Sequence, residues 1–181
     1  QTVDYVPPSA TPSVFTDQLI VKVFGNGGAD QITVESTFIT VPVRVEGGSG
    51  NDTITVGDGT LNDLDSFLNG NANDGFGFGP LVLVGGSGHD TVILNDSTDG
   101  NNADNVGNIT AFREKREGVP GLVEVGVVSG LGMKMTVPDV GVVDGHVEFE
   151  GFEVVEVRLG TGDDVMVVGG DLNLDSTDPG G

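Results

Sequence analysis

The chain of 181 residues contains no cysteine, which excludes disulfide bonds and thiolate metal sites. Basic residues are scarce: 7 Lys and Arg stand against 28 Asp and Glu, which gives a formal net charge of −21. Nucleic acids and anionic membranes are bound through clustered Lys and Arg, so this composition disfavours both partners. No apolar run in the sequence is long enough to insert into a membrane as a helix.

Helical periodicity is almost absent too. From residue 19 onward, apolar residues alternate with polar ones in short runs rich in Val, Ile, Thr and Phe, which is typical of β-strands. These runs argue against the disorder that an acidic chain with few aromatic residues can show. We therefore predict an all-β fold with a narrow core formed by Val21, Val23, Ile32, Val34, Val43, Val45, Ile54, Val56, Leu81, Leu83, Val92 and Leu94.

A glycine-rich motif recurs between these runs. Residues 47–55 read GGSGNDTIT and residues 85–93 read GGSGHDTVI, with weaker copies at 25–33 and 159–167. All four have aspartate at the sixth position and an apolar residue at the eighth, and each follows an alternating apolar run. Glycine allows positive φ, so such a turn can direct carbonyl oxygens inward, and Ca²⁺ prefers carbonyl and carboxylate oxygens. One turn with its aspartate thus offers oxygen ligands of the kind that Ca²⁺ prefers.

The spacing of the motifs predicts the organisation of the chain. The motif starts are offset by 22, 38 and 74 residues, so the first offset fits one coil and inserts enlarge the later ones. The main inserts are the polar loops 57–80 and 95–107. We predict a linker or extended cap at 1–16, one domain at 17–171, and a linker or tail at 172–181. Between 108 and 159 we expect strands at 108–112, 122–128, 133–137, 147–149 and 152–159.

The nine-residue motif resembles the repeat of hemolysin-type (RTX) calcium-binding proteins. The order Asn95–Asp99, Gly130–Met133, Glu150–Glu153 and Leu159–Asp164 is also similar to the long repeat of very large bacterial surface and secreted proteins, including adhesins. This resemblance implies a parallel β-helix or β-roll-like solenoid with coils of irregular length. It also implies folding on binding of several Ca²⁺ ions, and a secreted or cell-surface location.

The resemblance implies as well where the ions bind. The turns at 25–30, 47–52 and 85–90 would stack and share ions, with Asp30, Asp52 and Asp90 as ligands. The turn at 159–164 would stack next if the segment 95–158 completes a coil. The candidate metal-binding residues are Gly25, Gly27, Asp30, Gly47, Ser49, Asn51, Asp52, Asp58, Gly85, Ser87, His89, Asp90, Asp96, Gly160, Gly162, Asp163, Asp164 and Asp171.

Three of these residues have two interpretations of about equal weight. Asp58 and Asp96 each lie six residues beyond a motif aspartate, and Asp171 lies seven beyond Asp164. They could line a second row of sites on the opposite edge of the fold. They could also simply end strands, because aspartate suits turns.

Catalysis is not expected. His89 occupies a variable position of a turn, where its side chain should face solvent, and His146 begins a strand. No Gly-x-Ser-x-Gly nucleophile motif surrounds Ser49 or Ser87. We therefore expect a structural module that serves as a spacer, adhesin or surface-layer segment, with neighbouring repeats or copies of itself as partners. One alternative is calcium-dependent binding of a glycan or protein by loops 57–80 and 95–107. A weaker one is an accessory part of a polysaccharide-modifying enzyme.

Overall fold

A computed structural model describes residues 20–37, 42–62, 64, 81–98, 106–114, 120–137 and 141–169. The predicted cap at 1–16, the predicted tail at 172–181, Asp171 and most of the two insert loops lie outside these ranges. The described residues form β-strands joined by turns, and none of them belongs to a helix that could cross a membrane. The prediction of an all-β fold is confirmed.

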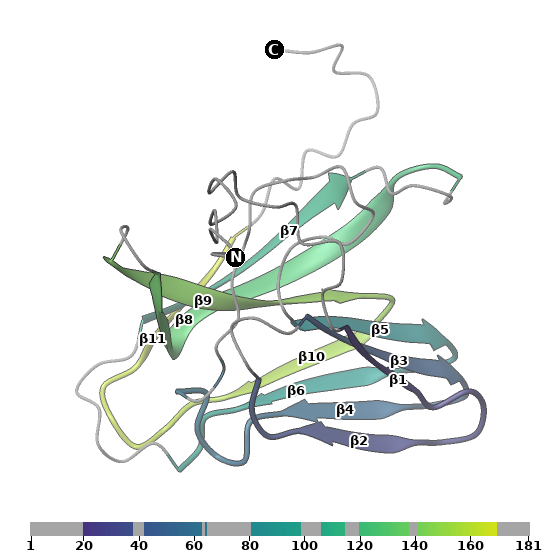
Figure 1. Cartoon of the computed structure of the whole chain (residues 1–181), viewed down its shortest axis with the longest axis horizontal. Coiled ribbons are helices and arrows are strands. Elements are labelled where there is room, and N and C mark those ends of the chain that lie inside the picture. Colours follow the sequence, from purple (N-terminus) through teal and green to yellow (C-terminus); the bar gives the residue numbers. More distant parts are fainter. Residues whose placement is uncertain are drawn as a thin grey trace, which may run out of the picture.

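The strands form two sheets (Figure 1). The large sheet contains, in spatial order, β1 (Val21–Phe24), β3 (Val43–Ser49), β5 (Leu81–Ser87), β9 (Gly141–Glu150), β8 (Val123–Val137), β7 (Val106–Glu114) and β11 (Val165–Val168). The small sheet contains β10 (Val154–Arg158), β6 (Thr91–Asn95), β4 (Thr53–Val56) and β2 (Gln31–Val34).

The chain alternates between the sheets from β1 to β6. Each pass adds one strand to the large sheet and the next strand to the small sheet, always parallel to its predecessor. Val45 pairs with Leu83 in the large sheet, and Ile54 pairs with Val92 in the small sheet, so equivalent positions of successive passes lie side by side. The offsets of 22 and 38 residues therefore each correspond to one full pass.

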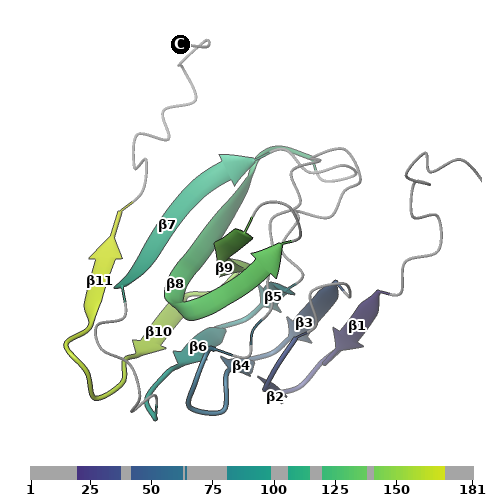
Figure 2. The same ribbon diagram turned by 60° about the vertical axis from the view of Figure 1, so that its left-hand side comes forward.

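An antiparallel segment then interrupts this pattern. β7, β8 and β9 all belong to the large sheet, where β8 pairs antiparallel with both β7 and β9. The chain then returns to the small sheet as β10, which lies beside β6 (Figure 2). The sequence predicted two strands at 122–128 and 133–137, whereas the structure has the single strand β8. A register shift between Ser129 and Lys134 bends β8 where Leu131 adopts a φ of 51°. Leu131 and Met133 are fully buried there, so the bend closes the core.

The core follows the predicted list closely. Seven of its members are completely buried: Val45, Ile54, Val56, Leu81, Leu83, Val92 and Leu94. Ile32, Val34 and Val43 are partly buried against them. Val21 and Val23 differ, because β1 is the edge strand of the large sheet and each remains 38% exposed.

Leu83 and Leu122 offer a matched test of this core. Leu83→Ala should lower the free energy of unfolding by about 2–5 kcal/mol, because Leu83 is fully buried between the two sheets. Leu122→Ala removes the same atoms from a side chain that is 60% exposed, so it should change stability by less than about 0.5 kcal/mol. Urea denaturation of both variants in one buffer measures the difference. Equal losses would contradict the packing described here.

Candidate metal sites between stacked turns

Three glycine-rich turns lie on one edge of the fold, where β1, β3 and β5 pass to the small sheet (Figure 1). Their backbones stack in register: Gly27 bridges to Ser49, and Ser49 pairs with Ser87. Hydrogen bonds join neighbouring turns, with the amides of Gly28 and Gly50 each donating to the serine carbonyl of the next turn at 2.8 Å. The structure therefore brings together the three turns predicted to stack.

Glycine is required by this close stacking. Gly50 has a φ of 132°, and a methyl group on its Cα would collide with the carbonyl oxygen of Gly28 in the preceding turn. Gly88 has a φ of 139° and stands in the same relation to the carbonyl of Gly50. The glycine at the fourth position of the motif thus has a steric explanation that is independent of any metal.

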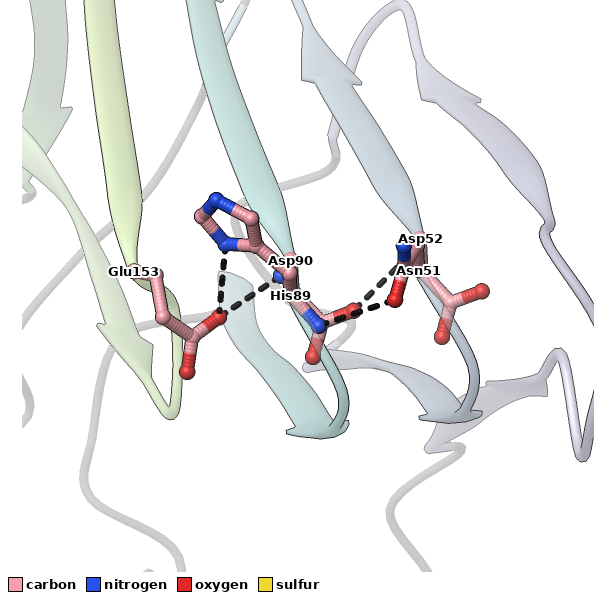
Figure 3. A network of polar contacts seen from close by, with 5 residues as sticks. All are labelled: Asn51, Asp52, His89, Asp90 and Glu153. Carbon is pink, nitrogen blue, oxygen red and sulfur yellow. Dashed lines mark hydrogen bonds and ion pairs between the residues drawn. The ribbon is translucent and has the colours of Figure 1, made fainter.

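The motif aspartates form a row of hydrogen bonds from turn to turn, and Figure 3 shows its part from Asp52 to Glu153. The amide of Asp30 donates to Oδ1 of Asp52 at 2.9 Å, and the amide of Asp52 donates to Oδ1 of Asp90 at 2.8 Å. The amide of Asp90 donates in the same way to Oε2 of Glu153 at 2.6 Å. One oxygen of each accepting carboxylate is therefore used to hold the preceding turn in register.

The second carboxylate oxygens have no such partner. Oδ2 of Asp30, Asp52 and Asp90 is buried and accepts no hydrogen bond, and the side chains of Asp52 and Asp90 belong to residues only 1% and 0% exposed. A buried carboxylate oxygen without a partner is costly, because it has lost its hydration without replacement. A positively charged or hydrogen-donating neighbour would offset this cost.

A main-chain carbonyl oxygen of the next turn and each of these oxygens lie beside the same glycine. A methyl group on Gly47 would lie 2.5 Å from Oδ2 of Asp52 and 2.8 Å from the carbonyl oxygen of Gly85. Equivalent positions recur at Gly25, beside Asp30 and the Gly47 carbonyl, and at Gly85, beside Asp90 and the Gly151 carbonyl. The two oxygens of a pair are no more than about 5 Å apart, a separation that two ligands of one Ca²⁺ ion can have.

These residues fit a hard cation held mainly by the backbone. Among the described residues no three acidic or histidine side chains come together as a metal-binding group. Each position instead combines one carboxylate oxygen with a carbonyl oxygen of the next turn, the donor types that Ca²⁺ prefers. Further ligands of such an ion would have to be other turn carbonyls or water, since Ca²⁺ takes six to eight oxygens.

Other predicted ligands in these turns make turn-to-turn contacts or face solvent. Oδ1 of Asn51 accepts a hydrogen bond from the amide of His89 at 3.1 Å, so Asn51 ties its turn to the next one. Ser49 and Ser87 are exposed. The His89 side chain is 65% exposed, as expected for its position, and its Nδ1 lies 3.6 Å from Oε2 of Glu153.

The turn at 159–164 does not stack on the turn at 85–90. It joins β10 to β11, and β11 pairs with β7, so this turn lies on the opposite edge of the fold. Asp163 is exposed and Asp164 is half-buried. The expected position of this turn is occupied instead by Gly151–Glu153, because β9 rather than β11 continues the large sheet next to β5.

The proposed second row is only partly assembled. Asp58 and Asp96 lie on the opposite edge, each two residues beyond the paired Val56 and Leu94. Asp96 is fully buried and its Oδ1 accepts a hydrogen bond from the amide of Leu61 at 3.1 Å, whereas Asp58 is exposed. The bond to Leu61 matches the turn-forming interpretation for Asp96.

Glu153 was not among the predicted site residues. It extends the aspartate row, and the hydrogen bond from the Asp90 amide holds the pKa of its carboxyl below the usual range, with a smaller contribution from His89. The signal in the sequence was the order Glu-Gly-Phe-Glu at 150–153 directly before an alternating apolar run. This order has a glycine and an acidic residue before a strand but lacks the remaining glycines of the motif.

Gly50 and Gly28 provide a matched test of the stacking. Both have positive φ, but a methyl group on Gly28 would meet nothing within 4 Å, because its turn is the outermost one described. Gly28→Ala should therefore cost only the backbone strain, about 1–3 kcal/mol. Gly50→Ala should cost clearly more in chemical denaturation, since its methyl group also collides with the Gly28 carbonyl. Similar costs for both variants would argue against the stacked arrangement.

Comparison with protein-family models, with curated proteins and with solved structures found no match to this chain.

Proposed function

We propose that this chain is a calcium-stabilised β-solenoid module in which ions bind between successive glycine-rich turns. The observation that carries the proposal is the row of buried Oδ2 atoms on Asp30, Asp52 and Asp90. Each lacks a hydrogen-bond partner and lies near a carbonyl of the next turn. A divalent cation at each position would offset the cost of burying a charged oxygen.

The parallel passes support the solenoid part of the proposal. Strand, turn, strand and return form one unit, and successive units pair in register in both sheets from β1 to β6. In a solenoid each unit buries its apolar face against its neighbours. The complete burial of Ile54 and Leu83 in the second and third units, against partial burial of Ile32 in the first, agrees with this.

The charge of the chain supports a cation-dependent fold. A net charge of −21 on 181 residues opposes compaction by mutual repulsion. Cations bound only by the folded state neutralise part of this charge and shift the folding equilibrium by mass action. A calcium-rich environment outside the cell suits such a module, because extracellular calcium modules bind with Kd values of about 10⁻⁴–10⁻³ M. We therefore propose a secreted or cell-surface structural role, as a spacer or surface segment.

Asp52→Asn tests the metal sites directly. Asparagine keeps an oxygen that can accept the bond from the Asp30 amide but removes the charge from the site. Isothermal titration calorimetry with Ca²⁺ should show that the variant loses affinity about tenfold or more at one site, because affinity follows ligand charge. In the presence of calcium, its melting temperature should fall below that of the wild type.

Glu35→Gln is the matched control, since it also removes one carboxylate charge, at an exposed residue outside the row. It should leave calcium affinity close to that of the wild type. If the wild-type protein binds no Ca²⁺ at millimolar concentrations, the proposed function is wrong. Equal effects of the two substitutions would point to general charge screening in place of specific sites.

Removal of the metal should loosen the whole fold. Each pass buries only a few apolar side chains, so metal binding is expected to supply much of the folding free energy. In a chelator we expect circular dichroism to show weak β-structure and no cooperative melting, with both restored by excess Ca²⁺. Excess Mg²⁺ should restore less, because it demands a tighter octahedral site. A cooperative, β-rich spectrum in chelator would contradict this expectation.

A further inference from the structure

The connection between β9 and β10 forms a fourth turn that departs from the motif. It consists of Gly151, Phe152 and Glu153 only, whereas the preceding turn runs through the six residues 85–90. The flanking strands remain in register with that turn, because Val84 pairs with Glu150 and Thr91 pairs with Val154. The short turn therefore occupies the position of a fourth motif turn with half the residues.

Glu153 takes the place of the aspartate in this turn. Its Oε2 accepts the amide of Asp90 at 2.6 Å, as Oδ1 of Asp90 accepts the amide of Asp52 at 2.8 Å. Its own amide donates to the carbonyl of Asp90 at 3.2 Å, which fixes its backbone beside that residue. β10 is the last strand of the small sheet on this side, so Glu153 ends the row.

The oxygens around the last position differ from those of the inner ones. Oδ2 of Asp90 is buried without a hydrogen-bond partner, and the Gly151 carbonyl lies near it, beside Gly85. The fourth turn continues with Phe152 alone in place of the second glycine, the serine, the third glycine and the variable residue. It therefore has three fewer main-chain carbonyls than the preceding turn with which to complete a site. The Glu153 side chain is also 47% exposed, so this end of the row is open to water.

We propose that Oδ2 of Asp90 and the carbonyl of Gly151 form a terminal Ca²⁺ site of lower affinity, and that Glu153 positions Asp90 for it. This inference rests on the proposed function and deepens it. The row then holds three sites: two between motif turns, at Asp30 and Asp52, and one between a motif turn and the short turn, at Asp90. Glu153 acts through the Asp90 amide, so it is a positioning residue and contributes no fourth site.

The hydrogen bond from the Asp90 amide to Oε2 of Glu153 at 2.6 Å agrees with this role. The Glu153 carboxylate accepts an amide of the preceding turn although its side chain is 47% exposed, whereas Asp52 and Asp90 accept the equivalent amides with buried side chains. The longer side chain of glutamate is suited to that contact.

The test uses Glu153→Ala with Glu156→Ala as its control. Glu156 lies three residues further along, has a side chain that is 46% exposed and pairs only with Arg158 at 2.6 Å among the contacts of the described residues. Calorimetry of the wild type should show two stronger sites and one weaker site. Glu153→Ala should weaken the third about tenfold or more and leave the first two unchanged, while Glu156→Ala should leave all three unchanged.

Glu153→Gln separates positioning from charge. Glutamine keeps an oxygen that can accept the Asp90 amide, so this variant should retain the third site with a loss of only a few-fold. Amide hydrogen exchange gives a second measurement: Glu153→Ala should accelerate exchange at the Asp90 amide at least tenfold and leave the Asp52 amide unchanged.

The outcomes distinguish this inference from the proposed function. If the wild type binds no Ca²⁺, the proposed function and the terminal site both fail, while exchange at Asp90 still decides whether Glu153 holds that amide. If the wild type binds Ca²⁺ but Glu153→Ala changes neither the third site nor exchange at Asp90, only the inference about Glu153 is overturned. Simultaneous loss of all three sites in a folded Glu153→Ala variant would also overturn it.

Discussion

The hydrogen bond from each motif aspartate amide to the next carboxylate is the interaction on which the rest of the fold depends. It links Asp30 to Asp52, Asp52 to Asp90 and Asp90 to Glu153, and so fixes the register of four successive turns. One oxygen of Asp52 and one of Asp90 are engaged in this way, and the other, like Oδ2 of Asp30, is buried without a hydrogen-bond partner. Register and candidate metal site are therefore two consequences of one arrangement.

This arrangement places like charges next to one another. Parallel pairing in register sets an aspartate beside an aspartate, and the chain has few basic residues to compensate. In the proposed function, cations between the turns would offset the cost of this arrangement. A cation shared by two turns would stabilise them only in the correct register, because a shift by one residue moves every side chain to the opposite face. Ion binding and strand pairing would then depend on each other.

Local patterns in the sequence predicted most of the strands and the glycine turns, and the family resemblance implied the stacking of 25–30, 47–52 and 85–90. They did not predict the position of the fourth turn. The motif at 159–164 matches better than Glu150–Glu153, yet it lies on the opposite edge. The reason is the antiparallel excursion through β7 and β8, which returns the chain as β9 beside β5. Pairing between strands so distant in sequence is not encoded by periodicity.

The sequence by itself determined the all-β character, the apolar strand faces and the identity of the residues in each turn, because alternation and glycine act over a few neighbouring residues. Only the tertiary structure decided which turns become neighbours. It placed Glu153 at the end of the aspartate row, separated Asp164 from it, and left Val21 and Val23 on an exposed edge. These outcomes depend on backbone pairing between distant strands, and that pairing is governed by the burial of the whole core.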